Sequence, residues 1–242
     1  MHFVLALLTI AAASDLQPVL PRLAAQFEMQ TGHTVHLTFG SSGNFLAQIR
    51  NGAPFDLFLS ADVDYPKQLE SAGLTEPRTL VSYATGALVL WTRNGSGLDL
   101  PRGLDALTDA RVRRIAIANP EHAPYGRAAV AALRARALYD QLQSKFVLGE
   151  NVSQAAQFAQ SGNADAGIVP LSLALSAPMR ASGRYVDIPQ SLYPPIEQAG
   201  VVIRSSREKD AARAFLAYLS RPEVAKILAE AGFGPAVALA GR

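Results

Sequence analysis

Short apolar stretches alternate along the chain with segments in which apolar residues recur every three or four positions. The first stretch, residues 7–13, precedes a segment whose apolar face consists of Leu16, Leu20, Leu23 and Phe27. This pattern predicts a strand followed by a helix that ends at Thr31-Gly32. Residues 34–39 and 55–59 begin two further units of the same kind. Three strand–helix units in succession favour parallel strands joined by right-handed crossovers.

The alternation returns after a long apolar run over residues 80–91, and we interpret Gly86 within this run as the passage into a second domain. The later strands are expected at residues 115–118, 145–148, 166–169 and 199–203. The later helices are expected from Pro124 to about Tyr139 and at residues 152–160, 207–219 and 222–231. The last strand and two helices are too short for a third domain, so we expect them to complete the first.

The sequence therefore predicts an α/β fold with two lobes, each a mostly parallel sheet flanked by helices. Lobe I is expected to comprise residues 1–82 and 199–242, and lobe II residues 83–198. A lobe that the chain leaves and re-enters has two connections, which is the geometry of a hinge that closes over a ligand. The ligand cleft is expected between the lobes, at the carboxyl ends of both sets of strands.

Composition narrows the possible functions. Hydrophobic residues make up 49% of the chain and charged residues 17%, which predicts a folded protein with an ample core. The formal charge of +2 includes no cluster of lysine or arginine, which argues against a nucleic-acid partner. The chain has no cysteine, so disulfides, thiolate metal sites and thiol nucleophiles are excluded.

The first thirteen residues admit two interpretations. An apolar start followed by three alanines is typical of a secretory signal peptide with its cleavage site. However, a positively charged start is missing, and cleavage after Ala13 would remove the first predicted strand. We therefore favour the strand and expect the signal peptide to be truncated or absent in this chain. No other stretch is long and apolar enough to span a bilayer.

Small and hydroxyl-bearing residues lie where strands pass into helices. Turns of this kind direct backbone N–H groups and hydroxyls towards one point, which suits an anion. They occur in both halves of the chain, at residues 8–16, 39–43, 59–62, 123–126 and 150–153. One such turn is weak evidence, because every α/β protein has them. Five in two halves predict a cleft that holds an oxyanion.

Each candidate residue also has a purely structural interpretation. Ser14 suits a helix N-cap, and Asp15 suits a first-turn acid stabilised by the helix dipole. Ser42 and Gly43 could form only a tight turn. Tyr125, at a predicted helix start, could pack in the core or reach a ligand with its hydroxyl.

Taken as a set, these turns supply neutral donors and no dedicated cation. Ala61 and Val152 offer only backbone N–H groups. Burying an anion costs several kcal/mol. Hydrogen bonds to a charged group return about 1.5–3 kcal/mol each, so six or seven converging donors can offset that cost. The site should favour a fully ionised oxyanion, because hydrogen phosphate needs an acceptor and Asp15 is the one nearby candidate.

Histidine offers no alternative site chemistry. His2, His33, His36 and His122 lack the spacing of metal ligands, and we interpret all four as non-catalytic. Three arginines before the strand at 115–118 are interpreted as a solvated face: Arg111, Arg113 and Arg114.

Two blocks of residues are specific enough to indicate a family. One is Gly52-Ala53-Pro54 followed by residues 56–62 (Asp-Leu-Phe-Leu-Ser-Ala-Asp), and the other is residues 119–126 (Asn-Pro-Glu-His-Ala-Pro-Tyr-Gly). Weaker matches are residues 11–14, 40–43, 48–51, 167–169 and 231–233. With these residues the chain resembles, over nearly its whole length, the periplasmic molybdate-binding proteins of ABC-type uptake systems.

The resemblance implies a two-lobed type II periplasmic-binding-protein fold that holds tetrahedral molybdate or tungstate, with no cofactor. It implies ligand contacts from the hydroxyl and N–H of Ser14 and Ser42 and from the N–H of Ala61 and Val152. Tyr125 occupies the remaining ligand position. These groups would bind the metal as its oxyanion, without ligating molybdenum directly.

Two residues depart from the family pattern. Members with alanine at position 125 place a ligand tyrosine after the Gly-Ile-Val strand, where this chain has Pro170. The simplest account is that Tyr125 supplies the phenol from another wall, and the alternative is a looser site with altered oxyanion preference. Asp15 replaces a residue that is more commonly apolar or an amide, which makes it a possible further contact along with Gly43.

We therefore expect a periplasmic, monomeric, non-enzymatic protein that captures molybdate, and tungstate as a second ligand, and delivers it to an ABC-type molybdate permease. The first alternative is a receptor for sulfate or another small tetrahedral oxyanion. Less favoured is an enzyme with Ser14 as nucleophile, because no general base is evident beside it. The effector-sensing half of a transcription regulator is also less favoured, because no helix-turn-helix segment precedes the first strand.

Overall fold

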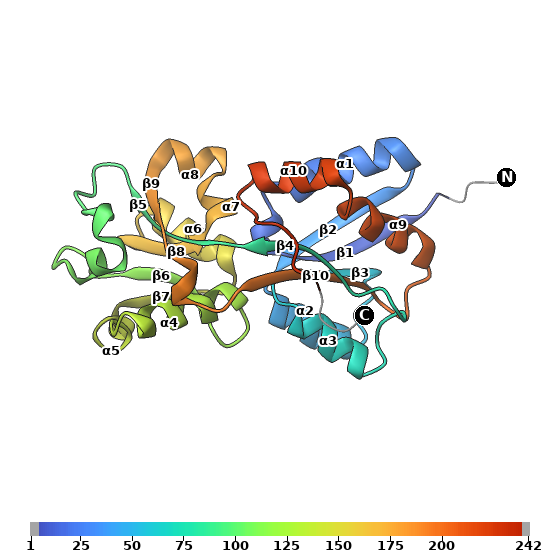
Figure 1. Ribbon diagram of the computed structural model, residues 1–242, viewed down its shortest axis with the longest axis horizontal. Helices are drawn as coiled ribbons and strands as arrows, with labels where there is room; N and C mark the ends of the chain where they lie inside the picture. The colour runs from blue at the N-terminus through green and yellow to red at the C-terminus, as the bar shows by residue number, and fades with distance from the viewer. Residues whose placement is uncertain (1–4, 239–242) are drawn as a thin grey trace. The chain divides into compact units, whose positions relative to one another are not determined.

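The computed structural model describes residues 5–238, which form two compact units (Figure 1). Unit 1 comprises the described part of Met1–Thr85 together with Glu197–Glu230 and the described part of Gly234–Arg242. Unit 2 comprises Gly86–Ile196 and Ala231–Phe233. Residues 1–4, including His2, lie outside the described residues.

The short return of Ala231–Phe233 to unit 2 is not part of the domain boundaries expected from sequence. Gly232, at φ 90°, is the middle residue of this return and packs closely against Leu171 and Leu175 of unit 2. A Cβ at this glycine would meet the Leu171 Cγ at 2.9 Å, so the close approach requires glycine.

The sheet of unit 1 has the strand order β2-β1-β3-β10-β4. Its strands are β1 (Leu7–Ala13), β2 (Thr34–Gly40), β3 (Leu57–Ser60), β4 (Val81–Gly86) and β10 (Ile196–Val202). The predicted parallel pairing of the first three strands is confirmed, since β1 pairs in parallel with both β2 and β3. The sheet is nevertheless mixed, because β10 starts beside the end of β3 and runs back along it, with Ala199 opposite Ser60.

Helices cover both faces of this sheet, with α2 and α3 on one face and α1, α9 and α10 on the other (Figure 1). They are α1 (Leu20–Thr31), α2 (Ser42–Arg50), α3 (Asp64–Ser71), α9 (Lys209–Leu219) and α10 (Pro222–Glu230). The α2/α3 face buries Phe45, Phe58 and Leu69. On the other face, the rings of Phe27 and Phe215 lie 4.9 Å apart in an edge-to-face arrangement. Each face thus has its own apolar layer.

The first helix begins later than the sequence predicts. A single 3-10 turn, η1 (Ser14–Leu16), follows β1, and α1 starts only at Leu20. Pro18 and Pro21 account for the delay, because proline cannot donate the backbone hydrogen bond that a continuous helix requires. The predicted end is confirmed, since Gly32 caps α1 in the left-handed conformation at φ 76°.

The sheet of unit 2 has the strand order β7-β6-β8-β5-β9. Its strands are β5 (Leu88–Arg93), β6 (Ile115–Ala118), β7 (Phe146–Gly149), β8 (Ala166–Pro170) and β9 (Gly183–Asp187). β6 pairs in parallel with β7 and β8, whereas β5 pairs antiparallel with β8 and β9. This sheet too is mixed rather than mostly parallel. The sequence did not predict β9, which has a largely exposed pattern and no apolar run.

In unit 2, α6 lies on one face of the sheet and α4 and α5 on the other (Figure 1). The α-helices are α4 (Pro124–Ala135), α5 (Tyr139–Leu142), α6 (Val152–Ser161), α7 (Leu171–Ala174) and α8 (Ala177–Ser182). The 3-10 segments are η2 (Leu100–Thr108), η3 (Gln143–Lys145) and η4 (Gln190–Leu192). α4 ends earlier than predicted because Ala137 adopts φ 55° and turns the chain. None of the helices in residues 5–238 has the length and apolar character needed to cross a membrane.

Candidate functional site

The register of unit 1 brings three predicted turns to one edge of its sheet. Ala13 lies opposite Gly40, and Ala12 lies opposite Leu59, so β1, β2 and β3 end together. The residues that follow these ends include the candidates Ser14, Ser42 and Ala61, all of which are buried. Parallel strands end at a common edge, and this is where α/β proteins hold ligands.

Ser42 and Ala61 are in direct contact. The Ala61 N–H donates to the Ser42 Oγ at 3.0 Å, in a buried hydrogen bond between turns 19 residues apart. Because the hydroxyl oxygen accepts this bond, the Ser42 O–H proton remains to be donated to another acceptor. In this structure, the Ala61 N–H therefore orients the Ser42 hydroxyl.

The first turn of α2 supplies further donors. The first backbone hydrogen bond of this helix is donated by the Phe45 N–H to the Ser41 carbonyl oxygen, at 3.1 Å. The N–H groups of Ser42 and of the half-buried Gly43 precede it and have no acceptor within the helix. They lie at the positive end of the helix dipole, where an anion is stabilised.

Ser14 does not cap a helix. The residue that precedes η1 is Ala13, and Ser14 is the first residue of this turn, with its carbonyl accepting from the Gln17 N–H at 3.2 Å. The N-cap interpretation of Ser14 is therefore wrong. The serine is 2% exposed, at the carboxyl end of β1.

Asp15 belongs to a buried polar network that the sequence did not reveal. Its Oδ2 accepts from the Gln198 Nε2 at 2.6 Å, and the Gln198 Oε1 accepts from the Tyr83 hydroxyl at 3.1 Å. Burial, and secondarily the charge of Asp15, raises the pKa of the Tyr83 phenol well above its ordinary value. Gln198 lies 183 residues from Asp15 and 115 from Tyr83, so no local pattern links them.

In unit 2, two further turns lie next to each other. Ala118, at the end of β6, lies opposite Gly149, at the end of β7. α4 begins with Pro124, and α6 begins with Val152 after Asn151, whose side chain accepts from the Gln154 N–H. The N–H of Val152 belongs to the first turn of α6 and has no acceptor within the helix.

Tyr125 is the second residue of α4 and is 2% exposed. The adjacent Gly126 packs the helix start tightly onto β6, since a Cβ there would lie 2.1 Å from the Ala118 carbonyl oxygen. Pro170, which stands where some members of the family that the chain resembles have a ligand tyrosine, is the buried last residue of β8. It pairs with Leu88 of β5 within the sheet.

The three histidines within the described residues, His33, His36 and His122, differ in their surroundings. The His33 Nδ1 accepts from the Ala6 N–H at 3.2 Å, and His36 is exposed. The His122 Nε2 lies 3.9 Å from Glu150, which joins the two turns of unit 2. Among residues 5–238, no group of three or more histidine, aspartate or glutamate side chains could hold a metal ion.

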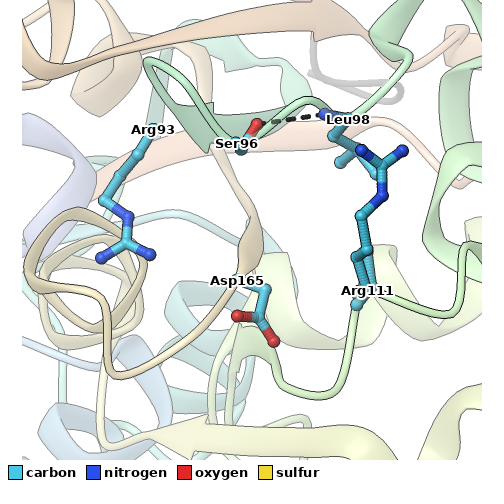
Figure 2. Close-up of a pocket in the computed structure, with 6 residues that line it drawn as sticks. Arg93, Ser96, Leu98, Arg111 and Asp165 are labelled. Carbon is cyan, nitrogen blue, oxygen red and sulfur yellow. Dashed lines mark hydrogen bonds between the residues drawn. The ribbon is translucent and has the colours of Figure 1, made fainter.

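A separate pocket of about 120 Å³ lies in unit 2 (Figure 2). It is lined by Arg93, Ser96, Leu98, Arg111, Val112 and Asp165, none of which is a candidate ligand residue. Arg111 is paired with Asp109 at 2.6 Å, and its guanidinium holds the pKa of that carboxyl well below its usual range. Asp165 accepts the backbone N–H groups of Arg113 and Arg114. Arg111 and Asp165 are thus each engaged by neighbouring groups.

Comparison with known proteins places these features in a family. Residues 8–234 match the model of the bacterial extracellular solute-binding proteins. The chain is 38% identical over 223 residues to the molybdate-binding protein ModA of Rhodobacter capsulatus, covering 92% of this chain and 86% of that protein. It is 37% identical over 225 residues to ModA of Azotobacter vinelandii, covering 93% and 88%. The solved periplasmic molybdate-binding protein of Azotobacter vinelandii superimposes with a TM-score of 0.87 over 93% of this chain and 98% of that one, at 37% identity.

Proposed function

Because the chain belongs to the ModA family of bacterial extracellular solute-binding proteins, we propose that it captures molybdate outside the cytoplasm and delivers it to an ABC permease. The family consists of binding proteins, so its members act by affinity and recognition and not by catalysis. The observation within the fold that carries the proposal is the shared edge of β1, β2 and β3. At this edge, buried serines and helix-start N–H groups follow aligned strand ends.

The proposed contacts come from both units. Unit 1 contributes Ser14, Ser42 and Ala61, and unit 2 contributes Tyr125 and Val152. Gly43 and Asp15 lie next to two of these residues and are possible further contacts. Because the contacts are hydroxyl and N–H donors, they suit a dianion that has four oxygens to accept and no proton to give.

The proton count of the ligand supports this specificity. Hydrogen phosphate carries a proton and needs an acceptor in its site, whereas molybdate carries none and only accepts. We therefore propose that molybdate is preferred to phosphate, and that tungstate, a dianion of the same shape, binds as a second ligand.

Calorimetric titration of the anion-free protein tests the function. Molybdate and tungstate should bind with similar Kd values, and sulfate about 100-fold more weakly, which corresponds to about 2.7 kcal/mol. Tighter binding of sulfate or phosphate than of molybdate would overturn the assignment.

A matched pair of serine variants tests the proposed contacts. Ser42→Ala should weaken molybdate binding, because Ser42 lies at the shared strand edge. Ser96→Ala, in the arginine pocket of unit 2, should leave it unchanged. Equal effects of the two substitutions would refute the proposed contacts.

The proposed partners are one permease and one anion, with the protein acting as a monomer and without nucleic acid. Light scattering with and without molybdate should give the mass of a single 25.7 kDa chain. A dimeric mass, with or without molybdate, would refute the proposal that the protein is a monomer.

A further inference from the structure

The backbone conformation of Gly86 does not require glycine. It is the last residue of β4 and the first residue of unit 2. It is not among the glycines with positive φ, so its backbone conformation is open to any residue. Glycine weakens a strand interior and usually marks a place where another group approaches closely.

The group that approaches is the phenol of Tyr125. A Cβ at Gly86 would lie 2.0 Å from the Tyr125 hydroxyl oxygen and 2.7 Å from its Cζ. The Ile196 Cγ2 would lie 3.2 Å from the same Cβ. The hydroxyl therefore occupies the space of the missing side chain at Gly86, in a slot that Ile196 also borders.

The surroundings of Tyr125 hold its side chain in this slot. Its neighbour Gly126 has no room for even a methyl group against the Ala118 carbonyl oxygen, which fixes the start of α4 on β6. Tyr125 itself is 2% exposed, so its ring is packed among other groups of the protein. A side chain at Gly86 must consequently displace the phenol.

We propose that Gly86 is a positioning residue for oxyanion binding: its missing side chain forms the slot that holds the Tyr125 hydroxyl where the ligand meets it. The inference rests on the proposed function, in which Tyr125 is a ligand contact. Gly86 and Ile196 are also the first and last residues of the long segment of unit 2. The Tyr125 phenol thus lies beside both ends of this segment.

A double-mutant cycle with molybdate calorimetry tests the inference. Gly86→Ala should weaken molybdate binding about 10- to 100-fold, the loss expected for one hydrogen bond to a charged ligand. Tyr125→Ala should weaken it at least as much. In the Tyr125→Ala background, Gly86→Ala should cause no further loss, because the phenol that it displaces is gone.

Gly183→Ala provides a matched control for steric damage. Gly183 is also an extended residue of unit 2, and a Cβ there would lie 2.0 Å from the Trp91 ring. This substitution should lower the thermal stability while leaving the Kd for molybdate unchanged.

Thermal unfolding without ligand tests the contact between Gly86 and Tyr125 independently of the proposed function. Gly86→Ala should lower the Tm, and the added Tyr125→Ala should restore part of the loss, even if the wild type binds no molybdate. Wild-type affinity in Gly86→Ala, or an equal further loss when it is added to Tyr125→Ala, would overturn the inference. So would a Gly86→Ala variant that fails to fold with and without Tyr125→Ala. Absence of molybdate binding by the wild type would instead overturn the proposed function.

Discussion

Replacing Gln198 with leucine should destabilise unit 1 by removing the centre of its buried polar network. Gln198 is completely buried, donates to the Asp15 Oδ2 at 2.6 Å and accepts from the Tyr83 hydroxyl at 3.1 Å. Leucine has a similar volume but no polar atoms. The substitution therefore removes both hydrogen bonds without opening a large cavity.

The expected magnitude follows from the groups that lose their partner. Depriving a buried acceptor of its donor costs about 1–3 kcal/mol, and the Asp15 Oδ2 loses the Gln198 donor. The Tyr83 hydroxyl adds about 1 kcal/mol for its lost acceptor. A total of about 3 kcal/mol corresponds to a decrease in Tm of roughly 6–12 °C for a chain of this length.

Thermal unfolding of the ligand-free protein, followed by circular dichroism, measures this decrease. Tyr83→Phe alone should cost about 1 kcal/mol, because it removes only the hydroxyl. In the Gln198→Leu background, Tyr83→Phe should cost less than it does alone, because the hydroxyl no longer has an acceptor to lose. A Tm of Gln198→Leu within about 2 °C of the wild type would show that the network contributes nothing and refute the reasoning.

Three further predictions concern single groups. Ser42→Ala should raise the Kd for molybdate about 10- to 150-fold, by loss of about 1.5–3 kcal/mol, while Ser96→Ala leaves calorimetric titrations unchanged. Asn151→Ala removes the cap on the Gln154 N–H at 3.1 Å and should cost about 1 kcal/mol in urea unfolding; a value near zero would contradict the capping role. Because burial raises the pKa of Tyr83, its neutral phenol stabilises the fold fully below the unfolded value of about 10, and this contribution is lost as the pH rises through the folded pKa. Unfolding monitored between about pH 9 and 12 should show less of this decline in Tyr83→Phe, and an identical decline would refute it.

The sequence by itself determined most of the local structure. Apolar periodicity predicted β6 at its observed bounds and α6 to within one residue, because these elements depend on neighbouring residues and on the alternation of apolar positions. It also predicted the glycine end of α1, since a left-handed cap is a local requirement. The small and hydroxyl-bearing turns that suggested an oxyanion were visible for the same reason.

Only the tertiary structure decided how distant segments meet. Three contacts join residues that are far apart in the chain. They are the antiparallel pairing of β10 with β3, the hydrogen bond from the Ala61 N–H to Ser42, and the network of Asp15. The role of Gly86 was likewise hidden, because the phenol of Tyr125 that fills its missing side chain lies 39 positions away. Close approach and buried hydrogen bonding are properties of packed neighbours, and periodicity along one chain carries no record of which neighbours those are.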